Sequence, residues 1–146
     1  MVLDPEFAHA VRDVETAALG DFARGDAASF KDLWSHTDDV TIFGGYGAYE
    51  QGWDQVGPRL DWAAARFPLS TGGKYEALAA DCSGELGYAI GIERCQATVA
   101  DRAEPAEIVL RVSHLFRREQ GRWQFIHRHA DPMTAVLAPT GLLREH

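Results

Sequence analysis

The residue types that could carry out chemistry gather in one stretch near the C-terminal end of the chain. Positions 106–130 hold three of the six histidines, His114, His127 and His129, together with Arg128. An imidazole can exchange a proton near neutral pH, and a guanidinium can bind a carboxylate or polarise a carbonyl oxygen. The stretch therefore predicts a site for acid–base chemistry or for binding an anionic or carbonyl-bearing small molecule.

This stretch has the pattern of two β-strands joined by a tight turn. Residues 106–118 and 122–130 are rich in β-branched and aromatic side chains, and a Gln-Gly pair between them favours a turn. Side chains alternate between the two faces of a strand, and the face that carries His114 is the more apolar face of the first strand. We therefore expect His114 to point inward as a candidate catalytic base and Arg111 to point away.

The preceding strand, residues 86–99, offers a second candidate for the interior. Its bulkier face carries large apolar residues and Arg94, whereas Glu93 shares the opposite face with small residues. Burying the bulkier face places Arg94 beside His114. We expect Arg94 to bind the ligand, and Glu93 to lie on the outer surface, where it could pair with Arg111.

The last strand, residues 122–130, leaves the orientation of its polar groups open. One face carries His127 and His129 with two aromatic residues, and the other carries Arg128. Either face could be inside, especially if a β-bulge shifts the alternation. An inward Arg128 would suit an anionic or carbonyl-bearing ligand. Inward histidines would favour acid–base chemistry, with His129 as the base and His127 as a ligand contact.

Three aromatic residues complete the candidate ligand contacts. Trp34 and Trp62 are expected in the core or in the wall of a pocket. Tyr46 lies in a glycine-rich turn, where its hydroxyl could donate to a ligand at a cavity mouth or simply face water. His127 and His129 could point two imidazoles to one side, but the sequence places no third ligand, so we predict no metal site. No phosphate-binding glycine loop, dinucleotide fingerprint or H-E-x-x-H motif occurs, and no cofactor is predicted.

Helices in the N-terminal half must help to position these groups. Apolar residues at helical spacing predict a long helix over residues 5–22, a short one after the Gly25-Asp26 junction, and another over residues 53–67. Pro58 lies inside the last of these. A proline there removes a helical hydrogen bond, so this helix is expected either to kink or to begin at Gly57.

Strands dominate the rest of the chain. A short strand at residues 40–43 ends at a glycine-rich turn, and four longer strands follow, over residues 74–82, 86–99, 106–118 and 122–130. Consecutive strands with short connections indicate an antiparallel meander, and so an α+β protein. We expect a single domain over residues 1–146, with an irregular tail at 132–146.

Length, charge and composition exclude several classes of partner. With 146 residues, 46% of them hydrophobic and 25% charged, the chain is long enough for one domain with a single core. Its net charge of -8 would repel phosphate groups, so no nucleic acid partner is expected. No apolar run could span a bilayer, no export signal begins the chain, and only two cysteines occur. We therefore expect a cytoplasmic protein with reduced thiols and no membrane partner.

The order of these elements resembles the nuclear transport factor 2-like superfamily. The resemblance is carried by the Gly25-Asp26 junction, the strand and turn at residues 40–47, and the ending Trp123-x-x-x-His127-x-His129. Within the superfamily the chain is similar to SnoaL-like and ketosteroid isomerase-like proteins and to the association domain of calcium/calmodulin-dependent kinase. This resemblance implies an α+β fold in which three N-terminal helices are wrapped by a curved antiparallel β-sheet into a cone with an open pocket.

The resemblance also implies a ligand and an assembly. The association domain that the chain resembles lines its cavity with arginines, and the positions matching two of them are Arg94 and His114. A small-molecule ligand, anionic or carbonyl-bearing, is therefore expected near these residues. Superfamily members commonly pair their outer sheet surfaces in dimers. A homodimer is expected here too, because the outer face carries apolar residues such as Val109 and Leu115.

Isomerases, cyclases and dehydratases of this superfamily act on small hydrophobic carbonyl compounds, and the resemblance extends to that chemistry. Ketosteroid isomerases use an aspartate base and a tyrosine in the oxyanion hole. The matching positions here are Gly44 and Ala18, so the standard steroid isomerase mechanism is not expected.

Two hypotheses of function remain. The first is a cofactor-free isomerase, cyclase or dehydratase-type enzyme, in which His114 or His129 is the base and Arg94 or Arg128 polarises a carbonyl or carboxylate. The second is a non-catalytic ligand-binding or assembly module that uses the same pocket without turnover.

Overall fold

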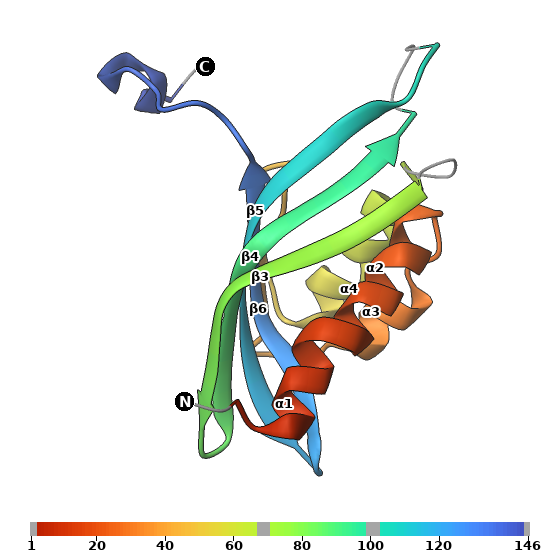
Figure 1. Cartoon of the computed structure of the whole chain (residues 1–146), viewed down its shortest axis with the longest axis vertical. Coiled ribbons are helices and arrows are strands. Elements are labelled where there is room, and N and C mark those ends of the chain that lie inside the picture. The colour runs from red at the N-terminus through yellow and green to blue at the C-terminus, as the bar shows by residue number, and fades with distance from the viewer. Residues whose placement is uncertain (1–2, 67–70, 99–102, 145–146) are drawn as a thin grey trace.

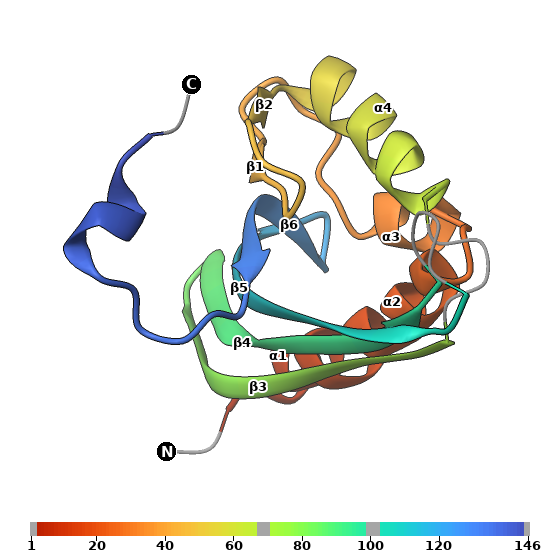
Figure 2. The ribbon, with the colours of Figure 1, turned by 90° about the horizontal axis from the view of Figure 1, so that it is seen from above.

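A strongly bent β-sheet wraps around a group of helices, as Figure 1 and Figure 2 show from two directions. This computed structural model describes residues 3–66, 71–98 and 103–144. The expected helix end at Phe67 and the expected strand end at Val99 lie outside the described residues. The N-terminal helices lie along the concave face of the sheet (Figure 2), so the interior forms between helices and sheet.

The first helical run is interrupted by one wide turn. It consists of α1 (Pro5–His9), the π-helical η1 (Ala10–Val14) and α2 (Glu15–Ala23). Asp4 caps the start, because its side-chain oxygen accepts a hydrogen bond of 3.1 Å from the backbone N–H of Phe7. The expected long helix is thus present, but its register changes inside η1.

Two further helices follow, with different boundaries from those expected. Helix α3 (Ala28–Asp32) is a short helix that buries Phe30. Helix α4 (Trp53–Ala64) runs through Pro58, so the alternative start at Gly57 is wrong. Its first turn is held from outside, because the N–H of Trp53 donates to the carbonyl of Thr37 over 3.0 Å.

Six strands of the described part of the chain form one sheet. In spatial order they are β2 (Glu50–Gln51), β1 (Thr41–Phe43), β6 (Arg122–Pro132), β5 (Ala106–Glu119), β4 (Leu86–Ala97) and β3 (Thr71–Ser83). The α+β class and the antiparallel run from β3 to β6 are confirmed. Strand β1 adds to the free edge of β6 in parallel, with Thr41 opposite His127, a pairing that the spacing of the chain did not predict.

Strand β4 faces the opposite way from our expectation. Its buried side carries Glu93 and small residues, whereas Arg94 points outward. The reason is space: a Cβ atom added to Gly87 would come within 2.7 Å of the ring of Phe7 on α1. The helix packs so closely that only small side chains fit beneath it, and the bulkier face of β4 turns outward.

A β-bulge sets the orientation of β6. Phe125 pairs with Phe116 and His127 pairs with Leu115, so Ile126 is an extra residue in the ladder. Side chains before and after the bulge therefore share the inner face, and Arg128 is buried on the same side as Phe125. His127 turns to the other face.

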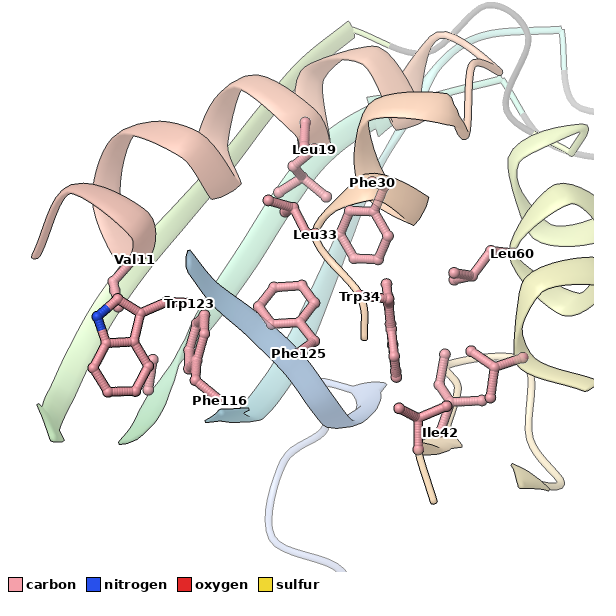
Figure 3. Close-up of a cluster of buried hydrophobic side chains, with 14 of the residues drawn as sticks. Val11, Leu19, Phe30, Leu33, Trp34, Ile42, Leu60, Phe116, Trp123 and Phe125 are labelled. Atoms are coloured by element: carbon pink, nitrogen blue, oxygen red, sulfur yellow. The ribbon is translucent and has the colours of Figure 1, made fainter. Parts of the chain in front are cut away.

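Aromatic side chains fill the core between the helices and the sheet, as Figure 3 shows. The ring of Phe7 meets the rings of Phe116 and Trp123 edge-on, at centroid distances of 5.1 and 4.9 Å. Trp34 is fully buried and meets Phe125 edge-on at 5.8 Å. Edge-on aromatic pairs add to the stability that comes from buried area.

The chain after β6 leaves the sheet and runs away from the rest of the molecule (Figure 1). This segment contains the short 3-10 helix η2 (Pro139–Leu142). The side chains of Val136, before η2, and Leu142, at its end, are almost fully exposed. Among the described residues no helix is both long and apolar enough to cross a membrane.

Candidate functional site

A cavity of about 530 Å³ lies between the concave face of the sheet and the helices. Most of its wall is apolar, with residues such as Leu19, Phe30 and Leu60. Two buried charged residues, Glu93 and Arg128, also line it. A mainly apolar wall with a few convergent polar groups is typical of a small-molecule site.

The two charged residues form a buried ion pair. The guanidinium of Arg128 donates from Nη1 to Oε2 of Glu93 over 2.6 Å and from Nη2 to Oε1 over 2.8 Å. Burial disfavours the ionised carboxylate, but the charge and hydrogen bonds of Arg128 outweigh it, so the pKa of Glu93 is lowered. Glu93 is therefore an ionised acceptor at neutral pH.

His114 lies beside this pair and is completely buried. Its Nε2 is 3.0 Å from Nη1 of Arg128, and its ring stacks on Phe125 at 4.1 Å. A guanidinium has only donors, so Nε2 must accept and the ring proton is on Nδ1. Burial, followed by the charge of Arg128, lowers the pKa of His114 to about 3, so its ring is neutral.

Glu15, the first residue of α2, completes the cluster. Its Oε1 is 3.0 Å from Nδ1 of His114, although the two atoms are not aligned as a hydrogen bond, and neither carboxyl oxygen has a hydrogen-bond partner among the described residues. Burial and then the charge of Glu93 raise the pKa of Glu15 well above the usual value. The Tyr75 hydroxyl is buried and unpartnered in the same part of the structure, and burial raises its pKa as well.

Comparison with known proteins places the chain in a family. The sequence model of the SnoaL-like domain matches residues 11–135. The chain belongs to the SnoaL-like family. No curated protein matches the chain.

Solved structures show the same fold. A protein described as a calcium/calmodulin-dependent protein kinase II association domain from Xanthomonas campestris superposes with a TM-score of 0.68 at 15% identity, over 93% of this chain and 95% of that one. A protein described as a dehydratase of the NTF2-like family from Streptomyces avermitilis gives 0.67 at 16% identity, over 84% and 93%. An NTF2-like superfamily protein from Salmonella enterica serovar Typhimurium gives 0.67 at 15%, over 90% and 97%. The expected fold of nuclear transport factor 2-like proteins is confirmed.

The SnoaL-like domain brings only some of the predicted site residues together. His114 and Arg128 meet in the buried cluster, and Arg128 lines the cavity. Arg94 lines the cavity too, but its side chain is 47% exposed and lies 3.7 Å from the carboxylate of Glu107, which places it at the rim. The expectation that Arg94 and His114 share the interior is wrong, because β4 turns its small residues inward.

Two predicted histidines lie on the other face of the sheet. His129 is half exposed, and its Nε2 is 4.0 Å from Asp131. His127 is bound to Oγ1 of Thr41 over 2.7 Å. The bulge at Ile126 turns both histidines away from the cavity, so this placement gives no support to His129 as a base or to His127 as a ligand contact there.

The aromatic candidates occupy three different environments. Tyr46 lines the cavity, is half exposed, and meets Trp62 edge-on at 5.1 Å. Trp62 does not line the cavity; its outer face is covered by the guanidinium of Arg66, 3.5 Å from the ring centroid. Trp34 is a core residue behind the cavity wall.

The sequence interpretation missed both acidic members of the cluster. Glu93 was assigned to the outer surface as a partner of Arg111, but it is buried on Arg128, and Arg111 binds Asp131 instead. Glu15 was passed over because it is charged, although its spacing of four residues from Val11 fits the buried stripe. A charged residue on an apolar stripe was the available signal.

A metal ion is the one further ligand that this cluster suggests. Ligand atoms of Glu15, Glu93 and His114 all lie within 4.8 Å of one another. However, Nη1 of Arg128 already contacts both Glu93 and His114. A guanidinium therefore takes the place that a cation would need, and we do not assign a metal site.

Proposed function

We propose that this SnoaL-like domain binds a small, mainly apolar molecule in its cavity, with a carbonyl or anionic head directed at Arg128. We further propose that the bound molecule undergoes cofactor-independent proton transfer of the isomerase, cyclase or dehydratase type. The observation that carries this proposal is the buried cluster of Arg128, Glu93 and His114 at a mainly apolar cavity. An apolar body and a single polar anchor are the complementary features of such a ligand.

Arg128 and His114 are the residues that this chemistry would use. A guanidinium in a cavity shielded from water can polarise a carbonyl oxygen and stabilise the negative charge that develops on it. The Nε2 atom of His114 has a lone pair, held 3.0 Å from Arg128, that could accept a proton once Arg128 turns to the ligand. Glu93 is a second base beside the same guanidinium. Arg94 and Tyr46 would contact the ligand at the rim.

Ligand binding is tested by a thermal-shift screen of enolisable ketones and small carboxylates. A ligand of the cavity should raise the melting temperature of the wild type. Ala63 lines the cavity on α4, whereas Ala65, two residues on, is exposed. Ala63→Trp should abolish the shift by filling the cavity, and Ala65→Trp should keep it. The proposal would be overturned if no compound shifted the wild type, or if the shift survived in Ala63→Trp.

A binding module without turnover is the second candidate, and one observation favours it. Both nitrogens of the Arg128 fork are occupied by Glu93 and His114, so neither of these two bases faces the cavity unobstructed. Several solved structures with this fold are described as association domains or, in the case of one from S. rosetta, as a kinase hub. Deuterium exchange at the α-carbon of a bound ketone would support chemistry. Saturable binding without exchange would support the module.

We also propose a homodimer in the cytoplasm. The outer face of the sheet exposes large apolar residues, among them Tyr88, Ile90 and Leu115, each more than 40% accessible. Their burial against a second copy would remove this surface from water. Both cysteines are free thiols, which suits a reducing compartment. Light scattering that reported a monomer at micromolar concentration would contradict the dimer.

A further inference from the structure

We propose that Glu15 is a further functional residue of this site, a neutral carboxylic acid that holds a proton behind His114 and leaves Glu93 as the ionised carboxylate of the cluster. Glu15 does not line the cavity and acts through His114, so it is a positioning residue. This inference takes the cavity as the functional site and therefore rests on the proposed function.

The first argument is the direction of the hydrogen bonds around Arg128. Its Nη1 donates to Glu93 and lies 3.0 Å from Nε2 of His114. Because a guanidinium cannot accept, a second proton on His114 would place two donors against each other. The contact therefore excludes an imidazolium, and His114 cannot supply a positive charge for Glu15.

The second argument is the balance of charge among the groups that face Glu15. They come from all four long strands: Tyr75 from β3, Glu93 from β4, His114 from β5 and Arg128 from β6. Arg128 is the cation in this set, and both arms of its fork are bound to Glu93. An ionised Glu15 would be a second buried carboxylate without a cation of its own, an arrangement that costs several kcal/mol.

The third argument is that both oxygens of Glu15 are fully buried and make no hydrogen bond among the described residues, since Nδ1 of His114, 3.0 Å from Oε1, is not aligned to donate. A carboxylate carries its charge on both oxygens and needs donors for each, whereas a neutral acid needs far less. The raised pKa of Glu15, caused by burial and then by the charge of Glu93, agrees with this assignment. The buried hydroxyl of Tyr75 also lacks a partner.

A local distortion of the helix places Glu15 in this position. Phe7 and Glu15 lie eight residues apart, which on a regular helix of 3.6 residues per turn separates their directions by about 80°. The π-helical turn η1 lies between them and ends at Val14, directly before Glu15. A wider turn brings Phe7, Val11 and Glu15 onto the same buried side. Single π turns inside helices occur frequently at functional sites.

The consequence is a separation of acid and base within one cluster. His114 holds its lone pair on Nε2, toward Arg128 and the cavity, while the stored proton stays on Glu15 behind it. Pairs of titratable groups whose environments drive their protonation apart are how enzymes assign an acid and a base. Arg128 thereby sets which atom of His114 can accept a proton from a ligand, and a neutral Glu15 adds no second negative charge behind that ring.

The first test uses the ligand-free wild type, so it does not depend on a variant that folds. With ¹³C-labelled glutamate carboxyl groups, NMR should show one resonance that remains protonated at neutral pH and disappears in Glu15→Gln. The ¹⁵N spectrum of His114 should show a proton on Nδ1 and none on Nε2. The inference is overturned if every glutamate is ionised at neutral pH, or if His114 carries its proton on Nε2.

The second test compares variants. Glutamine imitates a neutral acid and cannot ionise, so Glu15→Gln should fold and keep the tautomer of His114, which the contact with Arg128 sets. A change of tautomer in Glu15→Gln would show that a charge on Glu15 had held it, and would contradict the neutral acid. Glu107→Gln, which removes an exposed carboxylate at the cavity rim, is the matched control and should resemble the wild type.

The pH dependence of the melting temperature gives a third test of the protonation state of Glu15. The pKa of Glu15 is raised in the folded protein, so the stability that this group provides is complete below the usual glutamate pKa and is lost as pH rises through the raised value. The wild type should therefore lose melting temperature relative to Glu15→Gln as pH rises from the usual glutamate pKa toward the raised value. Parallel curves for the two proteins would contradict the inference.

These experiments separate the inference from the proposed function. All three use protein without ligand, so they report the state of Glu15 even if no compound binds. A screen without any binder would overturn the function alone. An ionised Glu15 would overturn the inference alone, because Arg128 and the cavity would still be available to a ligand.

Discussion

Two arginine–carboxylate pairs lie on opposite faces of the same sheet and have similar hydrogen-bond lengths. On the inner face Arg128 binds Glu93 over 2.6 and 2.8 Å, and on the outer face Arg111 binds Asp131 over 2.9 and 2.8 Å. Both pairs are two-pronged. The inner side chains are 10% and 5% exposed, whereas the outer ones are 55% and 40% exposed.

Burial gives these similar pairs different consequences. Water and salt screen the outer pair, so its contribution to stability is small. The inner pair shares a low-dielectric space with His114 and Glu15, where each charge changes the protonation of the next. A hydrogen-bond pattern alone therefore does not identify a functional site. The burial of the pair and the residues around it must also be considered.

The sharpest test of this comparison removes each arginine in turn. Arg128→Met leaves Glu93 buried without a partner and should lower the free energy of unfolding by roughly 3–5 kcal/mol. Arg111→Met, the matched control, should cost about 0–1 kcal/mol. Both values come from urea denaturation of purified protein. Equal costs for the two variants would show that burial does not distinguish the pairs.

A double substitution asks whether the inner pair itself stabilises the fold. Arg128→Met combined with Glu93→Met removes both charges, and buried pairs replaced by apolar residues are often neutral or stabilising. We expect the double variant to recover most of the loss seen in Arg128→Met, by about 2–4 kcal/mol. Recovery with loss of ligand binding would mean that the pair is retained for function. A double variant as unstable as the single one would contradict this.

Much of the fold could be predicted from the sequence because its elements follow periodic patterns. The meander from β3 to β6 and the inward face of β5 with His114 follow from alternation and turn residues. The position of β1 beside β6 did not follow, because a parallel pairing over three residues leaves no mark in local spacing. The turn η1 was also missed, since both Val14 and Glu15 fit helical spacing from Val11.

The candidate site was predicted less well, for two physical reasons. The sequence analysis predicted the buried face of β4 from the size of its side chains. In the structure, close packing of α1 on Gly87 determines which face is buried, so Glu93 lies inside instead of Arg94. The orientation of β6 depended on a bulge that sequence could only offer as an alternative. Glu93 and Arg128 form one buried ion pair, so neither could be assigned to the interior until the inward faces of both β4 and β6 were known.

Protonation of His114 at low pH is expected to have an intermediate effect on the free energy of unfolding. Its pKa is lowered from 6.5 to about 3 in the folded protein, mainly by burial. The stability from the neutral ring is therefore complete above the unfolded pKa and is lost as pH falls toward the folded value. The wild type should lose roughly 1.4 kcal/mol per pH unit below about pH 6 from this group.

Replacing His114 by glutamine should remove this slope, because an amide does not titrate. His129→Gln is the matched control, since the side chain of His129 is 50% exposed on the outer face. Chemical denaturation between about pH 6.5 and 5 measures the slopes before most carboxylates protonate. A steep slope that persists in His114→Gln would assign the acid sensitivity to another group.

The smallest change in stability is expected at the cavity rim. Arg94 is 47% exposed and 3.7 Å from Glu107, so Arg94→Met should change the free energy of unfolding by less than about 1 kcal/mol. If Arg94 holds the polar end of a ligand at the rim, the same variant should lose the thermal shift caused by carboxylates. It should keep the shift caused by neutral ketones, which need no cation there. Denaturation and thermal shift measured on one preparation give both values. Arg94 would prove to be a structural partner of Glu107 if stability fell by several kcal/mol, and a bystander if both shifts were kept.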